Sequence, residues 1–127
     1  MGRASLGGIV DNGFDNKPGK TKRRATTSLR TVALEELLIK ANSPRAIDYF
    51  SLDVEGAEWF IAQAFPWHTL TVNILTVERP NELLKHLLVT NASMVYLKSH
   101  GRFGDLMYVH TTLAAEYRAK LGLKGTV

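Results

Sequence analysis

Two nearly continuous apolar segments of strand length mark the middle of the chain. Residues 46–54 and 70–77 are rich in β-branched and aromatic residues, and each is followed by a segment of helical composition. Apolar strands that alternate with helices are typical of a parallel sheet with helices on both faces. The pattern therefore predicts an α/β fold.

Further helices and strands flank these two units. Residues 99–105 connect the last two strands, and this connection is too short for a parallel crossover, so we expect an antiparallel hairpin. Pro80 is expected in the first turn of the third helix, and Gly122 is expected to end the last one. The full prediction comprises helices over residues 34–41, 57–65, 82–89 and 112–121, and strands over residues 46–54, 70–77, 94–98 and 106–110.

The first 27 residues differ from the rest of the chain in composition. They hold five of the ten glycines, and residues 1–30 carry seven Lys and Arg against two Asp, whereas the remainder holds nine basic and ten acidic side chains. We interpret residues 1–27 as a glycine-rich basic arm or loop, with one short strand around residues 8–10, and residues 28–127 as the folded domain. The basic cluster at residues 20–24 is most simply a solvated loop, and a phosphate or acidic partner is the alternative.

Composition and charge exclude several classes of protein. The chain has no cysteine, which rules out disulfides, thiolate metal sites and cysteine nucleophiles. Charged residues interrupt every apolar run before it reaches the roughly 20 residues that span a bilayer. The N-terminus does not resemble a signal peptide, because no apolar segment of sufficient length follows Arg3. We therefore expect a cytoplasmic protein without membrane contact. The near-neutral body argues against a general nucleic-acid binder.

Acidic side chains follow both apolar strands at the point where each strand ends. Asp53 and Glu55 follow the first strand, and Glu78 follows the second. Ligands of open α/β sheets bind outside the carboxyl ends of the strands, so this edge is the expected site. If the backbone stays extended as far as Glu55, its side chain points to the same side as that of Asp53. Gly56 allows a tight turn and a close approach of the backbone to a ligand.

Other polar residues allow more than one interpretation. Glu58 either favours the start of its helix or joins the acidic side chains at the sheet edge. His100, in a glycine-flanked loop beside the hairpin, is either a ligand-binding residue or an ordinary loop residue. We predict no metal site, because oxygen-only magnesium sites also need phosphate ligands. The remaining histidines lie on separate elements: His68, His86 and His110.

One segment resembles the signature of a known family. Residues 47–58, IDYFSLDVEGAE, are similar to the motif of FkbM-type methyltransferases, a hydrophobic strand that ends in D-V-E-G-x-E. Residues 30–38 resemble the segment that leads into this motif, and residues 75–78 resemble the family's next strand. Residues 104–109 resemble its terminal hairpin, so the resemblance covers residues 28–110.

The resemblance implies a Rossmann-like class I methyltransferase fold, with a seven-stranded sheet whose final pair is antiparallel. The chain would supply the C-terminal half of that sheet as a truncated domain, because residues 7–11 lack the strand and helix that flank the family's glycine-rich turn. The implied cofactor is S-adenosylmethionine. The implied activity is O-methylation of a hydroxyl on a small molecule or glycan.

The resemblance also implies roles for individual residues. Asp53 would lie nearest the transferred methyl group, and Asp53 or Glu55 would orient or deprotonate the acceptor hydroxyl. Asp53 and Gly56 would contact the cofactor. From their places at the end of the second strand and beside the hairpin, we expect Glu78 and His100 to bind the acceptor.

Two non-catalytic functions remain as alternatives. In the first, the chain is an α/β interaction module whose strand at residues 46–54 forms an unprotected sheet edge and pairs with another chain, including a second copy of itself. In the second, residues 17–24 attach the protein to phosphates or nucleic acid.

Overall fold

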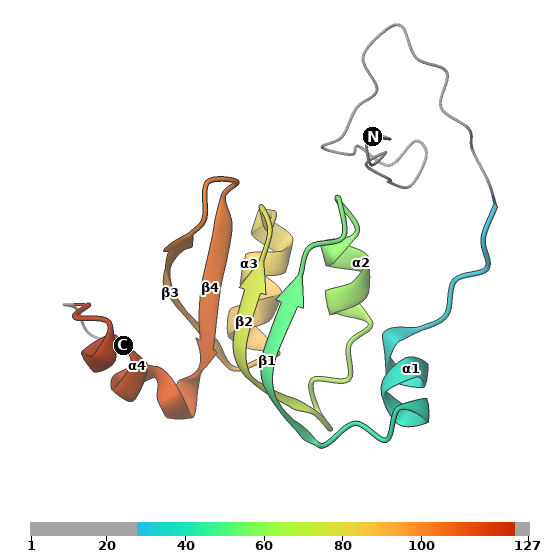
Figure 1. Cartoon of the computed structure of the whole chain (residues 1–127), viewed down its shortest axis with the longest axis horizontal. Helices are drawn as coiled ribbons and strands as arrows, with labels where there is room; N and C mark the ends of the chain where they lie inside the picture. The colour runs from blue at the N-terminus through green and yellow to red at the C-terminus, as the bar shows by residue number, and fades with distance from the viewer. Residues whose placement is uncertain (1–27, 124–127) are drawn as a thin grey trace, which may run out of the picture.

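The computed structural model describes residues 28–123, which form one mixed four-stranded sheet (Figure 1). Its strands are β1 (Ala46–Leu52), β2 (Thr71–Val77), β3 (Met94–His100) and β4 (Asp105–His110), in the spatial order β1-β2-β4-β3. β1 and β2 are parallel, and β4 is antiparallel to both of its neighbours. The α/β sheet, its parallel pair and its hairpin confirm the prediction. The predicted arm, its strand at residues 8–10 and its basic cluster lie outside the described residues.

β4 lies between β2 and β3, so the hairpin folds back into the sheet. The chain leaves β2, crosses to β3 at the edge of the sheet, and returns through β4 into the space beside β2. The hairpin register pairs His100 with Asp105. Both residues therefore lie at the edge of the sheet where β1 and β2 also end (Figure 1).

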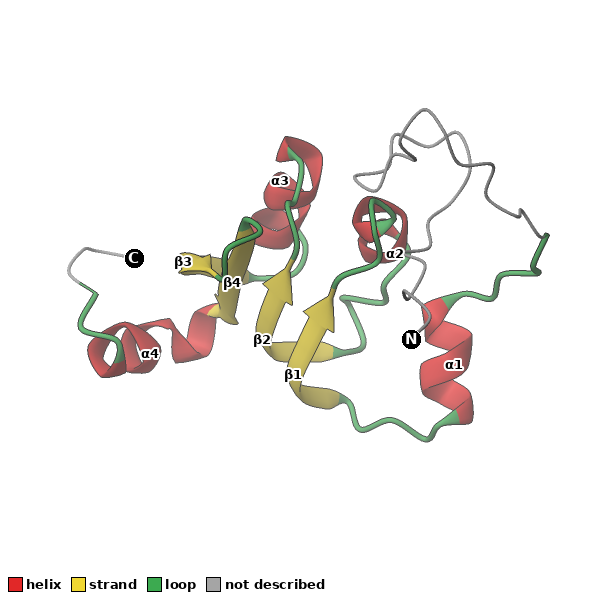
Figure 2. Cartoon of the chain, turned by 45° about the horizontal axis from the view of Figure 1, so that its top comes forward, coloured by secondary structure: helices red, strands yellow, loops and turns green. Residues whose placement is uncertain are grey.

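Helices cover both sides of the sheet. They are α1 (Leu34–Lys40), α2 (Glu58–Gln63), α3 (Glu82–Thr90) and α4 (Ala114–Lys120), the last preceded by the 3-10 turn η1 (Thr111–Leu113). Figure 2 shows α2 and α3 on one side and α4 on the other. One apolar core joins Leu75 of β2 to Leu84 and Leu88 of α3. A second core joins Val109 of β4 to Ala114 of α4. Each predicted helix is present, and its ends differ from the prediction by at most two residues.

The ends of two helices test the predicted stop and start signals. Asn81 caps α3, because its side-chain Oδ1 accepts a hydrogen bond from the backbone N–H of Leu84 at 2.8 Å. Pro80 therefore precedes the cap, and its expected place inside the first helical turn was wrong. Gly122 follows α4 with φ of 64° and confirms the predicted stop, since glycine adopts this conformation without steric cost.

β1 forms an open edge of the sheet. Within residues 28–123 it is hydrogen-bonded only to β2, as expected for a strand with a free edge. α4 packs on β3 and β4, and Tyr49 of β1 is 56% exposed. The expected covering of both faces therefore applies to β4 but not to β1.

Within the described ranges, every helix is too short or too polar to traverse a bilayer.

Candidate functional site

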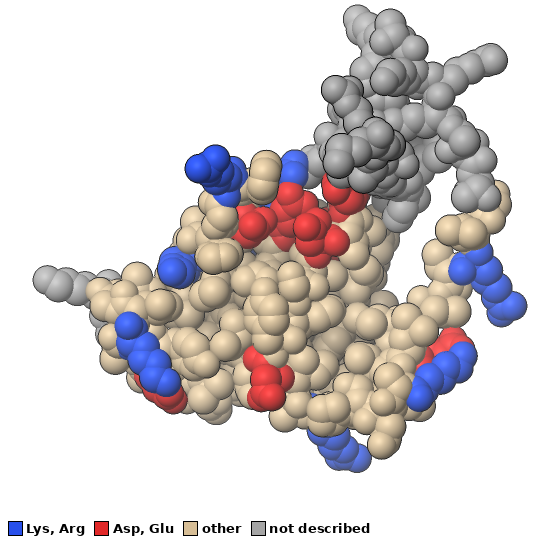
Figure 3. Space-filling view, viewed as in Figure 1, with Lys and Arg blue, Asp and Glu red and all other residues tan. Residues whose placement is uncertain are grey.

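Three carboxylates meet at the carboxyl ends of β1 and β2, and we call Asp53, Glu58 and Glu78 the acidic edge. Carboxylate oxygens of the three residues lie within 4.8 Å of one another. The backbone N–H of Glu78 donates to the Leu52 carbonyl at 3.0 Å, which continues the β1–β2 pairing beyond both strands and brings Asp53 beside Glu78. Figure 3 shows Asp and Glu side chains gathered at this end of the sheet.

Glu58 is the buried member of the acidic edge. Its side-chain Oε1 accepts hydrogen bonds from the backbone N–H groups of Val54 at 3.0 Å and Gly56 at 3.2 Å. The residue is 8% exposed. Glu58 therefore stabilises the turn before α2, rather than capping the N–H groups of the helix itself. Gly56 has φ of 93°, so the predicted tight turn is present.

Glu55 does not take the place expected for it. β1 ends at Leu52, and Glu55 has φ of 55°, so the extended backbone needed to align its side chain with Asp53 stops too early. Glu58, three residues further along the chain, occupies the position beside Asp53 instead. The condition on which Asp53 and Glu55 would share one side, an extended backbone as far as Glu55, is therefore not met.

Glu78 is held in place by its neighbour Arg79. The Arg79 guanidinium forms an ion pair with Glu78, and its Nε donates to Glu78 Oε1 at 3.1 Å. The side chain of Glu78 is 11% exposed. Arg79 also packs against the hairpin loop, since a Cβ at Gly104 would lie 3.2 Å from Arg79 Cγ. Sequence reasoning missed Arg79, and its adjacency to Glu78 was the signal that could have identified it.

A cavity of about 140 Å³ opens between the acidic edge and the hairpin. Asp53, Glu78 and His100 all line it, so three of the predicted site residues come together in one place. Asp105 lines the cavity beside its partner His100. Sequence reasoning did not single out Asp105, although it predicted the hairpin.

Hydroxyl groups line the same cavity. The Tyr49 hydroxyl lies 2.7 Å from Thr76 Oγ1, and Thr76 Oγ1 donates to Ser51 Oγ at 3.3 Å. Tyr49 and Ser51 lie two residues apart on β1, and Ser51 is the partner of Thr76 on β2. Carboxylates accept hydrogen bonds and hydroxyls both donate and accept them. The cavity therefore suits a ligand with hydroxyl groups or positive charge.

The acidic edge is also the only group of three or more acidic or histidine side chains within residues 28–123 that is arranged to bind a metal ion. Hard divalent cations take six or more oxygen ligands, and three carboxylates supply part of such a set. Glu58 and Glu78 already accept hydrogen bonds from the fold. His110 serves a structural role instead, since its Nδ1 lies 2.8 Å from Thr112 Oγ1 at the start of η1.

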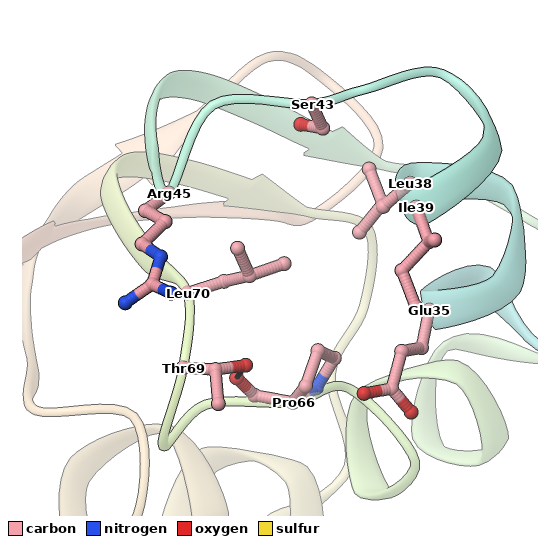
Figure 4. A pocket seen from close by; sticks show the side chains of 8 residues that line it. All are labelled: Glu35, Leu38, Ile39, Ser43, Arg45, Pro66, Thr69 and Leu70. Atoms are coloured by element: carbon pink, nitrogen blue, oxygen red, sulfur yellow. Dashed lines mark hydrogen bonds between the residues drawn. The ribbon is translucent and has the colours of Figure 1, made fainter.

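A second cavity, of about 220 Å³, lies where the chain enters β1 and β2, between α1 and the turn that follows α2 (Figure 4). Glu35 and Arg45 stand on opposite walls, and Leu38 and Leu70 project between them. This cavity lies at the amino ends of the strands, away from the edge where α/β sheets bind ligands. It holds none of the predicted site residues.

Comparisons with protein-family models, curated proteins and solved structures gave no significant match. We therefore infer the function from the residues of the chain and from the geometry described above.

Proposed function

We propose that this chain is an FkbM-like, S-adenosylmethionine-dependent O-methyltransferase domain whose acidic edge forms part of the active site. One observation carries the proposal. Asp53, Glu78 and His100 are separated in sequence, and all three line one cavity at the carboxyl ends of the parallel strands. The family resemblance implies a catalytic role for Asp53, and the sequence predicts Glu78 and His100 as acceptor-binding residues from their places in the sheet. The antiparallel β3–β4 pair also agrees with the end of the implied sheet.

The chemistry of the acidic edge suits part of the proposed cofactor. S-adenosylmethionine carries a positive sulfonium, a positive ammonium and two ribose hydroxyls, and carboxylates attract or accept hydrogen bonds from each of these groups. The cavity of about 140 Å³ is smaller than the roughly 300–1,000 Å³ of most small-molecule sites. The described residues would therefore supply one wall of the cofactor site. A glycine-rich strand–turn–helix of the kind that the resemblance implies is absent from residues 28–123.

In this proposal, the residues of the cavity bind the acceptor and accept its proton. The cofactor supplies an electrophilic methyl group when bound. The exposed carboxylate of Asp53 accepts a hydrogen bond from the acceptor hydroxyl and takes its proton. Glu78, fixed by Arg79, and His100 orient the acceptor. Alignment of the two reactants contributes most of the rate enhancement.

Calorimetric titration of the chain with S-adenosylmethionine tests the proposal. We expect saturable binding that Asp53→Asn weakens at least about tenfold, because the substitution removes the exposed charge of the acidic edge. Asp48→Asn is the matched control, since Asp48 is an exposed acid on β1 that bonds to Asn73 at 3.2 Å and does not line the cavity. Absence of heat at millimolar cofactor, or equal loss in both variants, would contradict the proposal.

The open edge of β1 favours a second candidate function, pairing with another chain. β1 contains neither proline nor lysine, the residues that commonly protect a free edge, and its Tyr49 is largely exposed. Self-association through β1 would protect its outward amide protons from exchange with solvent. Sedimentation velocity combined with hydrogen exchange measures both effects. A monomer at high concentration with unprotected β1 amides would exclude this function for the chain by itself.

A further inference from the structure

A larger cavity lies between α3 and the hairpin, and it shares no lining residue with the site at the acidic edge. Its volume is about 450 Å³, which falls within the range of small-molecule sites. Lys85 and Val89 of α3 form one wall, and Tyr96, Leu106 and Tyr108 form the other. The walls are therefore mainly apolar and aromatic, with one cation.

Tyr108 carries an unpaired polar group at this cavity. The residue is 2% exposed, and its ring packs edge-on against Tyr96 at 5.8 Å between ring centres. Its hydroxyl has no hydrogen-bond partner among residues 28–123. The only fully enclosed unpaired side-chain atom in that part of the chain is Arg118 Nε, so the Tyr108 hydroxyl reaches the cavity. Because it opens on the cavity, the hydroxyl takes its hydrogen-bond partner there: water in the free protein, or a ligand that replaces this water.

The Tyr108 hydroxyl remains a hydrogen-bond donor at neutral pH. Burial, together with the neighbouring Tyr96 and Glu82, raises the pKa of Tyr108 to about 12. The hydroxyl therefore keeps its proton. A ligand that satisfies it must present an acceptor oxygen or nitrogen.

Lys85 adds a positive charge beside that donor. Its Nζ pairs with Glu82 at 2.8 Å, and the two side chains are 38% and 88% exposed. Exposed pairs of this kind contribute little stability, so Lys85 can turn to a negatively charged ligand at small cost. Glu82 lies close to the same position and opposes such a ligand. Removal of the Glu82 charge should therefore strengthen binding.

We propose that this cavity binds a small aromatic carboxylic acid. The ring lies against Val89, Tyr96 and Leu106, and the carboxylate accepts hydrogen bonds from the Tyr108 hydroxyl and from Lys85. Val89 and Tyr96 are exposed apolar side chains in the free protein, and the ring covers them. The inference does not depend on methyl transfer or on the acidic edge.

Titration of the isotope-labelled full chain with 2-naphthoate, followed through backbone amide NMR shifts, tests this proposal. We expect saturable shifts in α3, β3 and β4, at residues around Lys85, Tyr96 and Tyr108. Tyr108→Phe should weaken binding at least about tenfold, which is the effect of one lost hydrogen bond to a charged group. Lys85→Met should weaken it as well, and Glu82→Gln should strengthen it.

Two controls keep the result specific. Tyr49→Phe removes a tyrosine hydroxyl that bonds to Thr76 and does not line this cavity, so the affinity should not change. 2-Naphthalenemethanol has the same ring without the charge and should bind more weakly than 2-naphthoate. Failure to saturate at millimolar ligand would mean that water alone satisfies the hydroxyl and would overturn the proposal. Equal affinity in wild type and Tyr108→Phe, or shifts confined to other elements, would overturn it too.

Discussion

The buried carboxylate of Glu58 accepts the backbone N–H of Gly56 at 3.2 Å and thereby closes the turn between β1 and α2. Because the same oxygen accepts the N–H of Val54, one side chain satisfies two amides of the turn. That turn fixes the position of Asp53 at the end of β1.

Replacement of Glu58 by alanine should destabilise the protein by about 2 kcal/mol, since it leaves two partly buried amides without a partner. Glu58→Gln keeps an acceptor oxygen and should cost less. Glu55→Ala, in the same turn, should change the free energy of unfolding by less than about 0.5 kcal/mol. Urea unfolding measures all three, and a cost for Glu55→Ala that equals that of Glu58→Ala would contradict the assigned role.

The sequence was a good guide where local composition determines structure. Residues 70–77 are so rich in β-branched side chains that a strand was predictable, and β2 covers nearly the same range. The carboxylate that joins Asp53 was not predictable, because strand alternation favours Glu55 whereas the left-handed backbone at Glu55 leaves Glu58 in that place. Nor could sequence place β4 between β2 and β3, since strand order depends on contacts between distant residues. The proximity of His100 and Glu78 follows from that order.

The orientation of α3 gives a second prediction. Leu84 is 1% exposed and packs in the core beneath the sheet, whereas the adjacent Leu83 is 63% exposed. Leu84→Ala should therefore cost about 2–5 kcal/mol of stability, and Leu83→Ala should cost less than about 0.5 kcal/mol. Thermal unfolding of the two variants distinguishes the two faces. Comparable losses would mean that α3 is rotated from the orientation described here.

The hydroxyl of Tyr108 should contribute little to stability, because it bonds to no described residue and opens on the cavity, where water can bond to it. Tyr108→Phe should therefore change the free energy of unfolding by less than about 0.5 kcal/mol and leave the Tm nearly unchanged. The substitution keeps the ring and its packing against Tyr96. A Tm lowered by several degrees would show that the hydroxyl donates to a group of the protein rather than to the cavity.

Stability should also depend on alkaline pH through Tyr108. Its pKa is raised from 10.0 to about 12, so the folded state holds the proton more tightly than the unfolded state does. The free energy of unfolding is therefore unaffected by Tyr108 below pH 10, and it falls as the pH rises toward 12. Denaturant unfolding across this range should show a smaller decrease in Tyr108→Phe than in wild type. An identical decrease in both proteins would assign the effect to other groups.

Asp53→Asn should leave the fold intact and slightly stabilise it. Three carboxylates lie within 4.8 Å of one another, and loss of one charge relieves repulsion among them. We expect a gain of about 0.5 kcal/mol at low ionic strength that declines in high salt, because salt screens exposed charges. A destabilised Asp53→Asn variant would mean that Asp53 supports the fold rather than ligand binding.

Amide NMR mapping of S-adenosylmethionine on the isotope-labelled full chain tests the central claim most directly, because it locates the ligand as well as detecting it. The proposed function predicts saturable shifts at residues 53–56, 77–79 and 100–105, which surround the acidic edge, and their loss in Asp53→Asn. Shifts confined to other parts of the chain, or no shifts at millimolar cofactor, would contradict it.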